Sequence, residues 1–429
     1  MFKQSAQHIG TYYARTYPGA IPLRPRQEGV LDCDVVIVGG GFSGLHSALR
    51  LSLAGKRVVL LEASRLAWAA SGRNGGQALL GWSCDMPPLE AALGQERTQR
   101  LWDSMRWAAE EMRELPQRHG FDIDYRTGSL WTAVQPRRVT ELQHAQRDLE
   151  DKWGYRQMRF IDRAELPEWI ASPRYLAALY DPEAAHLNPL KLALGLANAI
   201  EQAGGRIFEQ SQAVAYHEAN GGYTVRTEHG EVRGDVLVLA CNAYIDRLDR
   251  HLSSRLLPVG SYQVATVPLD PEQARALLPR NSCVIDNQFV PDYFRLTPDH
   301  RLLFGGGCTY LGGIPRDVAA ATRPYLERVF PQLRGVEIEF GWGGHIDVSM
   351  KRTPDIGRQG QRYWLQGFSG HGILPTLAGA RAVTDAILGN DDLLALYQAL
   401  DNPRFPGGSR LAAPLEAVGK AWYRLRDVI

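Results

Sequence analysis

The feature that most constrains this sequence is a glycine-rich turn between an apolar run and an amphipathic segment. The stretch DCDVVIVGGGFSGLHSALRLSLAGKRVVLLEAS, residues 32–64, contains Gly39, Gly41 and Gly44 in G-x-G-x-x-G spacing. Four apolar residues precede the glycines, and a second apolar run ends at Glu62. The pattern predicts a strand, a tight turn, a helix and a second strand, which together form one βαβ unit.

Each glycine has a separate role in such a turn. The first permits the tight turn, the second lets the backbone approach a pyrophosphate, and the third lets the helix pack closely on the strand. The helix N-terminus then offers free N–H groups to phosphates. Glu62, roughly 20 residues on, is placed to accept hydrogen bonds from a ribose diol and would repel a 2′-phosphate. The sequence therefore predicts an NAD or FAD site and disfavours NADP; the alternative is a structural turn with an ordinary surface glutamate.

Two further turns favour FAD over NAD. The loop ASGRNGGQ, residues 70–77, follows Glu62, where the phosphates and ring of a flavin would continue. Its glycines permit close backbone approach, and Arg73 and Asn74 supply hydrogen-bond donors. The distant GFSGHG, residues 367–372, ends a predicted strand and opens a predicted helix, whose N-terminus would stabilise the negative charge of a reduced flavin. Two such turns from opposite ends of the chain indicate one long cofactor.

These segments resemble the D-amino acid oxidase family of FAD-dependent amine and amino-acid oxidoreductases. The resemblance covers nearly the whole chain and includes YYA (12–14), CNAY (241–244), YFRLTPDHRLLFGGG (293–307) and FPGG (405–408). It implies an α/β protein with a discontinuous Rossmann-like FAD-binding domain and a second, α+β substrate domain built on an antiparallel sheet, as in glutathione reductase and D-amino acid oxidase. Gly344 stands where sarcosine oxidase has its linking cysteine, so the expected FAD is non-covalent.

The resemblance also implies which residues hold FAD. At the pyrophosphate and adenosine these are Gly39, Gly41, Phe42, Ser43, Gly44, Glu62 and Ala63, with Val214 at the adenine. Along the ribityl chain and ring they are Ser71, Gly72, Arg73, Asn74, Gly75, Gly76 and Gln77. On the pyrimidine side they are Gly370, His371, Gly372, Ile373 and Thr376. His371 and Gln77 are the candidate catalytic residues, although a structural role for His371 is the alternative, and whether Lys351 acts as a base stays open.

The chain of 429 residues is longer than one compact hydrophobic core usually supports, so two domains are predicted. The FAD-binding domain is assigned to segments 31–95, 170–245 and 341–395, and the substrate domain to segments 96–169 and 246–340. The terminal arms are residues 1–30, expected to lie on the surface, and residues 396–429. Helices are predicted at 96–119 and 190–203, a strand pair at 121–134, and a hairpin at Gly221-Gly222. Residues 255–340 are predicted as an antiparallel sheet and 341–358 as turn-rich.

Composition excludes several classes of function. A net charge of +1 argues against a nucleic-acid partner. The N-terminus lacks the apolar core of a secretory signal, and no apolar run is long enough for a membrane span, so the expected location is cytoplasmic. Five scattered cysteines without a C-x-x-C pair predict neither a disulfide framework nor a metal site.

The expected substrate is an amine whose reacting carbon carries no carboxylate. Amino-acid and glycine oxidases of the family have a G-x-R-P arginine that clamps the substrate carboxylate, but the matching GWGGHID (341–347) has none. Leu374 stands where sarcosine oxidase has a lysine. The alternative is that Arg295 or Arg352 substitutes for these cations.

The resemblance therefore implies FAD-dependent oxidation of a primary or secondary amine, above all a γ-glutamylated polyamine such as γ-glutamylputrescine, in polyamine catabolism. The products would be an aldehyde, ammonia and hydrogen peroxide, with oxygen or an electron carrier as the acceptor. The alternatives are a sarcosine-, glycine- or D-amino-acid-type oxidase, and a non-catalytic flavin-binding assembly protein.

Overall fold

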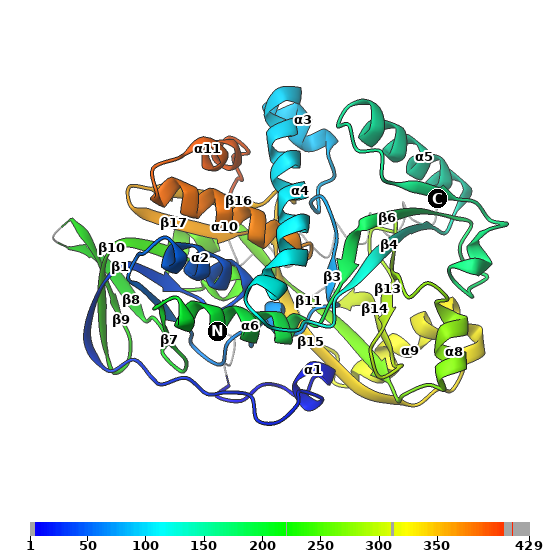
Figure 1. Ribbon diagram of the computed structural model, residues 1–429, viewed down its shortest axis with the longest axis horizontal. Helices are drawn as coiled ribbons and strands as arrows, with labels where there is room; N and C mark the ends of the chain where they lie inside the picture. The colour runs from blue at the N-terminus through cyan, green and yellow to red at the C-terminus, as the bar shows by residue number, and fades with distance from the viewer. Residues whose placement is uncertain (1–4, 220, 310–312, 407–413, 415–429) are drawn as a thin grey trace.

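The computed structural model describes residues 5–219, 221–309, 313–406 and 414. Two sheets lie side by side, each with its own helices (Figure 1). The FPGG segment falls partly outside the described residues.

The first sheet has eight strands, with β16-β17-β10-β1-β2-β7 as its main order. All neighbours from β17 to β7 are parallel, and β16 and the hairpin β8–β9 are antiparallel additions. The strands are β1 (Gly29–Val38), β2 (Val58–Leu61), β7 (Arg206–Phe208), β8 (Ala215–Ala219), β9 (Gly222–Arg226), β10 (Gly230–Leu239), β16 (Asp355–Gln359) and β17 (Arg362–Gln366). The carboxyl ends of β1 and β2 carry the glycine turn and Glu62, where ligands bind in open α/β sheets.

Helices pack on one face of this sheet, as Figure 1 shows. They are α2 (Phe42–Leu53), α6 (Pro189–Gln202) and α10 (Ile373–Ile387), with α4 (Gln95–Arg118) crossing α10. Ten of the twelve α2 residues are buried, so this helix lies in the core rather than on its surface. The shorter α3 (Pro87–Leu93) packs on α4, and α11 (Asp392–Gln398) packs on α10.

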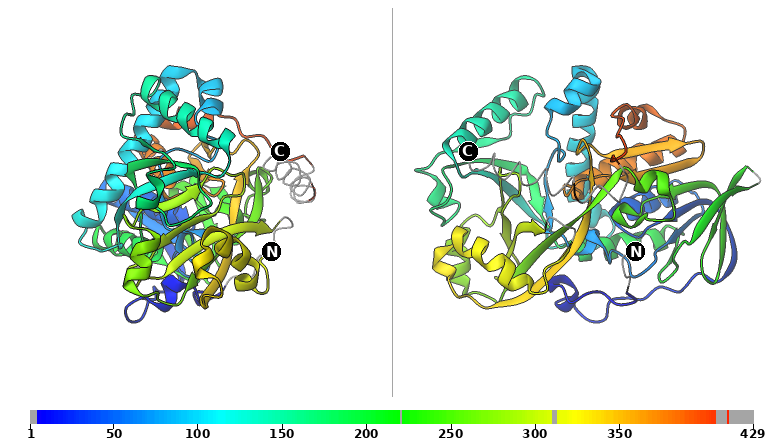
Figure 2. Two further views of the ribbon diagram at one scale, coloured as in Figure 1. Left: turned by 90° about the vertical axis from the view of Figure 1, so that its right-hand side faces the viewer. Right: turned by 180° about the vertical axis from the view of Figure 1, so that it is seen from behind.

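The second sheet has nine strands, in the order β15-β11-β14-β13-β12-β4-β6-β3 with β5 beside β6. The strands are β3 (Gln77–Ala78), β4 (Arg126–Ala133), β5 (Arg159–Ile161), β6 (Ala177–His186), β11 (Leu256–Thr266), β12 (Cys283–Asp286), β13 (Tyr293–Leu296), β14 (Leu302–Thr309) and β15 (Ile338–Ser349). Every pair is antiparallel except β12 with β4. The helices α5 (Pro136–Asp151), α8 (Pro271–Leu277) and α9 (Val318–Val329) lie around it, and α7 (Arg250–Ser253) precedes β11 (Figure 2).

Several predictions from the sequence are confirmed. The helices predicted at 96–119 and 190–203 are α4 and α6, the hairpin at Gly221-Gly222 is β8–β9, and the antiparallel sheet over 255–340 is built from β11 to β14. The strand pair predicted at 121–134 is wrong: this segment contains one strand, β4, whose register against β6 shifts between Thr127 and Ser129. Gly128, with φ of +100°, marks that irregularity rather than a turn.

Three strands lie in a different sheet from the one that the predicted domain boundaries imply. β3 and β6 lie in the antiparallel sheet although 31–95 and 170–245 were assigned to the FAD-binding domain. β15 also lies there, although 341–358 was predicted as turn-rich and grouped with the first sheet. Gly341, Gly343 and Gly344 interrupt the apolar alternation of β15, so its strand pattern is invisible in the sequence.

The N-terminal arm is not a surface segment throughout, which corrects the prediction for residues 1–30. Its helix α1 (Tyr12–Arg15) inserts two aromatic rings: Tyr12 is 5% exposed and Tyr13 is 0% exposed. The ring of Tyr13 packs edge-on against Trp342 of β15, with centroids 5.8 Å apart. The arm therefore contributes to the core between the two sheets.

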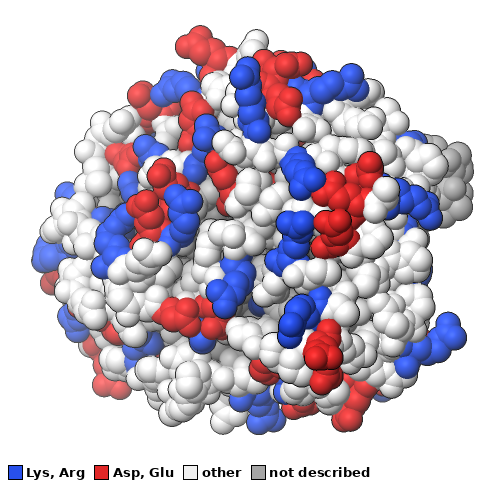
Figure 3. All heavy atoms as spheres, turned by 45° about the vertical axis from the view of Figure 1, so that its right-hand side comes forward, with Lys and Arg blue, Asp and Glu red and all other residues white. Residues whose placement is uncertain are grey.

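The surface carries both signs of charge. On the face in Figure 3, Lys and Arg alternate with Asp and Glu, and no single-sign field covers it. Among the described residues, no helix combines the length and apolarity that crossing a bilayer requires.

Candidate cofactor and active site

The glycine turn after β1 has room only for glycine at its two ends. At Gly39, where φ is +114°, a Cβ would lie 2.4 Å from the carbonyl oxygen of Ala240, and at Gly44 it would lie 1.9 Å from the carbonyl oxygen of Gly39. α2 then begins after Gly41, whose position supplies no side-chain cap. The N–H of Phe42 donates to Ser71, and the following N–H groups and the positive dipole end are available to a pyrophosphate, as the dinucleotide prediction requires.

Glu62 closes this turn from the end of β2. Its Oε2 accepts from the N–H of Gly40 at 2.7 Å, and its Oε1 accepts from the N–H of Ser64 at 2.8 Å. Burial raises the pKa of Glu62 to about 7, against the opposing effect of these hydrogen bonds. The carboxylate thus lies beside the glycine turn with lone pairs left for a ribose diol.

The loop of residues 70–77 is attached to the start of α2. Ser71 Oγ accepts from the N–H of Phe42 at 2.9 Å. Asn74 holds the loop internally, since its amide nitrogen donates to Ala70 at 3.0 Å and its Oδ1 accepts from Gly76 N–H at 2.8 Å. The loop, which we call the cofactor loop, therefore continues directly from the pyrophosphate turn.

Arg73 connects the cofactor loop to the second sheet. Its side chain, in a residue 7% exposed, donates to the carbonyls of Trp68 (2.8 Å) and Gly343 (3.0 Å) and stacks over the Trp68 ring. The carbonyl of Arg73 accepts from Trp342 Nε1 at 2.9 Å and from the amide of Gln263. Burial lowers the pKa of Arg73. Both ends of this residue are thus fixed by β11 and β15.

The second predicted turn, residues 367–372, follows β17 and is held by one carboxylate. Asp347 of β15 accepts from the N–H of Gly367 through its side chain, and its carbonyl accepts from the N–H of Ser369 at 2.8 Å. Burial raises the pKa of Asp347 to about 7. Gly370 has φ of +86°, and α10 begins after Gly372 without a side-chain cap. A second open helix N-terminus therefore exists, as predicted.

The segment that follows the cofactor loop contacts the turn 367–372. His371 Nε2 lies 3.0 Å from the carbonyl of Leu79, and Ser83 Oγ donates to the carbonyl of Ser369 at 3.1 Å. Because a carbonyl only accepts, Nε2 carries the proton, and burial lowers the pKa of His371, so the ring is neutral with Nδ1 as an acceptor. This junction places residues 79–83, which follow the cofactor loop, beside the turn 367–372.

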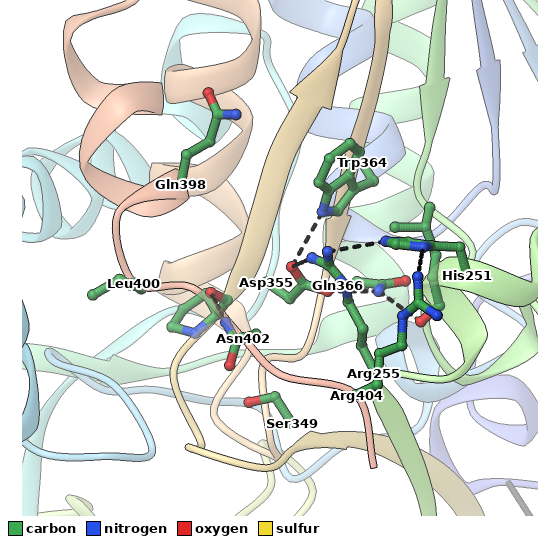
Figure 4. Close-up of polar contacts among 12 residues, drawn as sticks. His251, Arg255, Ser349, Asp355, Trp364, Gln366, Gln398, Leu400, Asn402 and Arg404 are labelled. Atoms are coloured by element: carbon green, nitrogen blue, oxygen red, sulfur yellow. Dashed lines mark hydrogen bonds and ion pairs between the residues drawn. The ribbon is translucent and has the colours of Figure 1, made fainter. Parts of the chain in front are cut away.

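A polar network fixes the strand that leads into this turn (Figure 4). Asp355 accepts from Gln366 Nε2 at 2.8 Å, from Trp364 Nε1 at 3.2 Å and from Arg255 at 3.1 Å. Gln366 is the last residue of β17, directly before Gly367. The network therefore sets where the turn begins.

Three residues with predicted roles already form hydrogen bonds within the protein, which bears on those roles. Gln77 Nε2 donates to the carbonyls of Val284 (2.9 Å) and Phe294 (3.2 Å), so this side chain attaches the loop to the second sheet. The N–H of Val214 donates to Arg226 at 2.8 Å, so bonding adenine through this group would displace a hairpin hydrogen bond. Lys351 is exposed and donates to the carbonyl of Leu400 at 3.1 Å.

The remaining predicted residues take the following places. Ser43 is buried in the first turn of α2, and Ile373 and Thr376 are buried in the first turn of α10, where Thr376 Oγ1 donates to Ile373. Ala63 follows Glu62, and Gly72 and Gly75 lie within the cofactor loop. Their contacts with FAD stay predictions.

Comparison with known proteins decides the family. Residues 34–386 match the profile of DAO, the FAD dependent oxidoreductases. This chain belongs to the DAO family. It is 38% identical to gamma-glutamylputrescine oxidoreductase of Escherichia coli K12, over 98% of this chain and 99% of that protein. It is 33% identical to the probable oxidoreductase OrdL of Haemophilus influenzae, over 98% of both chains.

The fold agrees with this assignment. The crystal structure of glycine oxidase from Bacillus cereus superposes with a TM-score of 0.71 at 21% identity, covering 87% of this chain and 99% of that one. The chain is an FAD-dependent oxidoreductase with a Rossmann-like first sheet and a second antiparallel sheet. FAD is thus the cofactor that the turn, Glu62 and the two loops fit.

Sequence reasoning missed several residues that build the site. Asp347, Gln263, Trp342 and Tyr13 contact the two turns from the second sheet or the N-terminal arm, and so does Arg295, which the sequence suggested only as a carboxylate clamp. Asp347 lies within GWGGHID, a stretch that was interpreted only for its lack of an arginine. Gln263, Arg295 and Trp342 reach the loop only through the non-local pairing of β11, β13 and β15, and Tyr13 reaches it from α1.

Proposed function

We propose that this oxidoreductase oxidises an amine whose reacting carbon bears no carboxylate, above all a γ-glutamylated polyamine such as γ-glutamylputrescine. The overall change is RCH₂NH₂ + O₂ + H₂O → RCHO + NH₃ + H₂O₂, with an electron carrier as the alternative to oxygen. The likeness to gamma-glutamylputrescine oxidoreductase over nearly the full length of both chains supports this substrate class.

The two arginines that could pair with a substrate carboxylate are already engaged by the protein, which supports a substrate without that group. The contacts of Arg295 are the observation on which this argument depends. Its guanidinium makes four hydrogen bonds to protein acceptors and is 2% exposed, so it does not clamp a ligand. Arg352 stacks on the ring of Phe289, 4.4 Å from the centroid. The stretch 341–347 forms most of β15 and contains no arginine. A planar carboxylate thus finds no bidentate partner at the places where the family pattern puts one.

The chain favours the neutral amine that hydride loss requires. The Tyr293 ring lies between the cofactor loop and β14, since a Cβ at Gly75 would lie 3.0 Å from it and one at Gly305 of β14 would lie 2.0 Å from it. Burial raises the pKa of Tyr293, which keeps the phenol neutral. An apolar aromatic wall disfavours an ammonium without a counter-charge and so lowers the pKa of a bound amine. Neutral His371 adds no positive charge that would repel it.

FAD, when bound, supplies the oxidising centre that accepts hydride from the amine-bearing carbon and passes the electrons to oxygen or a carrier. The chain's own contribution is to orient the cofactor through the two turns, to exclude water and to present an uncharged wall. Hydrolysis of the resulting imine yields the aldehyde and ammonia.

A peroxide assay of the purified flavoprotein tests the proposal. The panel comprises γ-glutamylputrescine, putrescine, spermidine, sarcosine, glycine and D-alanine. We expect kcat/KM for γ-glutamylputrescine to exceed that for every α-amino acid by at least about tenfold, since each tenfold ratio corresponds to roughly 1.4 kcal/mol of differential transition-state binding. Preferred turnover of glycine, sarcosine or D-alanine would contradict it and favour the amino-acid oxidase alternative.

Anaerobic mixing separates an enzyme from a non-catalytic flavin carrier. Bleaching of the flavin absorbance by γ-glutamylputrescine without oxygen is expected of an enzyme, whichever acceptor follows. If the flavin bleaches but no peroxide forms on admitting air, the acceptor is a carrier rather than oxygen.

A further inference from the structure

Arg295 is among the most deeply buried charged residues of the described chain. It lies on β13, is 2% exposed, and directs its guanidinium toward the cofactor loop. Nε donates to the carbonyl of Gly75 at 2.7 Å, NH1 to Leu296 at 3.2 Å, and NH2 to Leu187 at 3.0 Å. NH2 also donates to the hydroxyl of Tyr13 at 3.1 Å.

None of these four acceptors carries a charge. Within the described residues, no Asp or Glu oxygen lies within 4.0 Å of the Arg295 guanidinium. Arg301, six residues on and 7% exposed, shows the ordinary solution: it pairs with Asp299 at 2.7 Å and Glu339 at 2.5 Å. A buried cation without a counter-ion is costly, because carbonyl dipoles replace only part of its hydration.

The position of this uncompensated charge is specific. A Cβ at Gly76 would lie 2.9 Å from Arg295 NH2, and Tyr13, which accepts from Arg295, itself donates to the carbonyl of Asn74 at 2.8 Å. Arg295 therefore contacts three consecutive residues of the cofactor loop directly or through Tyr13. Arg73, on the same loop, also binds only carbonyls.

We propose that Arg295 is a positioning residue whose uncompensated charge favours the anionic, reduced form of the flavin and so raises its reduction potential. The inference rests on the proposed function only in placing FAD at the cofactor loop; it does not depend on which amine is oxidised. A reduced flavin gains negative charge, and a fixed cation nearby in a poorly polarisable interior stabilises that form more than the neutral oxidised form. The hydroxyl of Tyr13 and the loop carbonyls hold the cation in place.

A purely structural clamp would predict a different result. Arg295 joins the N-terminal arm, the cofactor loop and β13, so its removal must lower stability whether or not its charge reaches the flavin. The reduction potential separates the two, because it reports the ratio of affinities for reduced and oxidised FAD rather than the affinity itself.

The test is anaerobic potentiometry of the FAD-loaded full chain with three variants. Arg295→Met removes the charge, Arg295→Lys keeps a charge without the fork, and Arg301→Met removes a second buried arginine that is paired with carboxylates. Thermal unfolding of each variant is measured in parallel. We expect Arg295→Met to lower the potential by an amount equal to about a tenfold loss in relative affinity for reduced FAD, the order expected of one unit charge acting through a partly polar interior. At pH 7, Arg295→Lys and Arg301→Met should stay near wild type in potential although both lower the melting temperature.

An unchanged potential in Arg295→Met, or equal falls in Arg295→Met and Arg301→Met, would overturn the inference. If Arg295→Met does not retain FAD, the reduction potential of Arg295→Lys, measured from pH 7 to pH 10, provides the test instead. A buried lysine loses its proton in this range and arginine does not, so the variant's potential should fall more steeply with pH than that of wild type. Parallel curves would then overturn it. A wild type that holds FAD but oxidises no amine would contradict the proposed function alone.

Discussion

At the scale of the residue, burial gives Glu62 a raised pKa that its position in the sequence does not indicate. Its two carboxylate oxygens accept backbone hydrogen bonds, yet burial raises its pKa to about 7 from an ordinary 4.5. The folded apoprotein therefore binds more protons than the unfolded chain between these values. Because the folded pKa is raised, the contribution of this group to stability is present below pH 4.5 and is lost as pH rises toward 7.

We predict that FAD binding reverses this effect at Glu62. Ribose hydroxyls donate to the ionised carboxylate, lower its pKa and release a proton, so FAD affinity should strengthen as pH rises from about 5 to about 7.5. Fluorescence titration of the apoprotein across this range measures it. Glu62→Gln should bind FAD more weakly and lose the pH dependence, whereas Glu111→Gln, at a surface pair, should match wild type. A flat profile in the wild type would contradict the assignment of Glu62 to the ribose.

At the scale of the element, β15 joins the two halves of the site. It pairs with β11 along its length and ends close to the turn 367–372, where Asp347 accepts the Gly367 N–H. The glycines that hide this strand from pattern recognition also serve packing, since a Cβ at Gly344 would lie 2.7 Å from Arg73 Cδ. The helices α4 and α6 were predictable because their apolar periodicity is local.

Substitution of Asp347 tests whether β15 orders the flavin-side turn. Asp347→Ala leaves a buried N–H without its acceptor and should lower the free energy of unfolding by about 1–3 kcal/mol and increase FAD loss. Asp347→Asn keeps an acceptor oxygen and should recover part of both effects. Chemical denaturation and retained flavin absorbance after gel filtration measure them. Asp103→Asn, on the exposed face of α4, is the matched control. Equal behaviour of the alanine and control variants would show that the turn forms without Asp347.

At the scale of the whole molecule, the cofactor site is assembled from segments that span the chain. The N-terminal arm reaches the cofactor loop through Tyr13, and Trp68 Nε1 donates to the carbonyl of Gln7 at 3.1 Å. Leu79, two residues after the loop, contacts His371 of the turn 367–372. The arm thus behaves as a structural part of the site, not as a surface extension.

Truncation of the arm should therefore weaken FAD binding. Removing residues 1–16 deletes the Tyr13 and Gln7 contacts, each worth about 0.5–1.5 kcal/mol, and exposes the loop, so the Kd for FAD should rise about tenfold. Removing residues 1–5 leaves these contacts and should have little effect. Both are measured by flavin fluorescence. An unchanged Kd in the longer truncation would show that the arm only covers a site already complete.

The sequence by itself determined the dinucleotide turn, its glutamate, the cofactor loop and the turn before α10, because these are short motifs whose chemistry depends on neighbouring residues. It also indicated the two-sheet α/β organisation. Only the tertiary structure decided that Arg295 supports the cofactor loop, that Asp347 supports the turn 367–372, and that β6 and β15 belong to the second sheet. Those relations come from strand pairings between distant segments, and burial and charge compensation exist only once these segments are packed together.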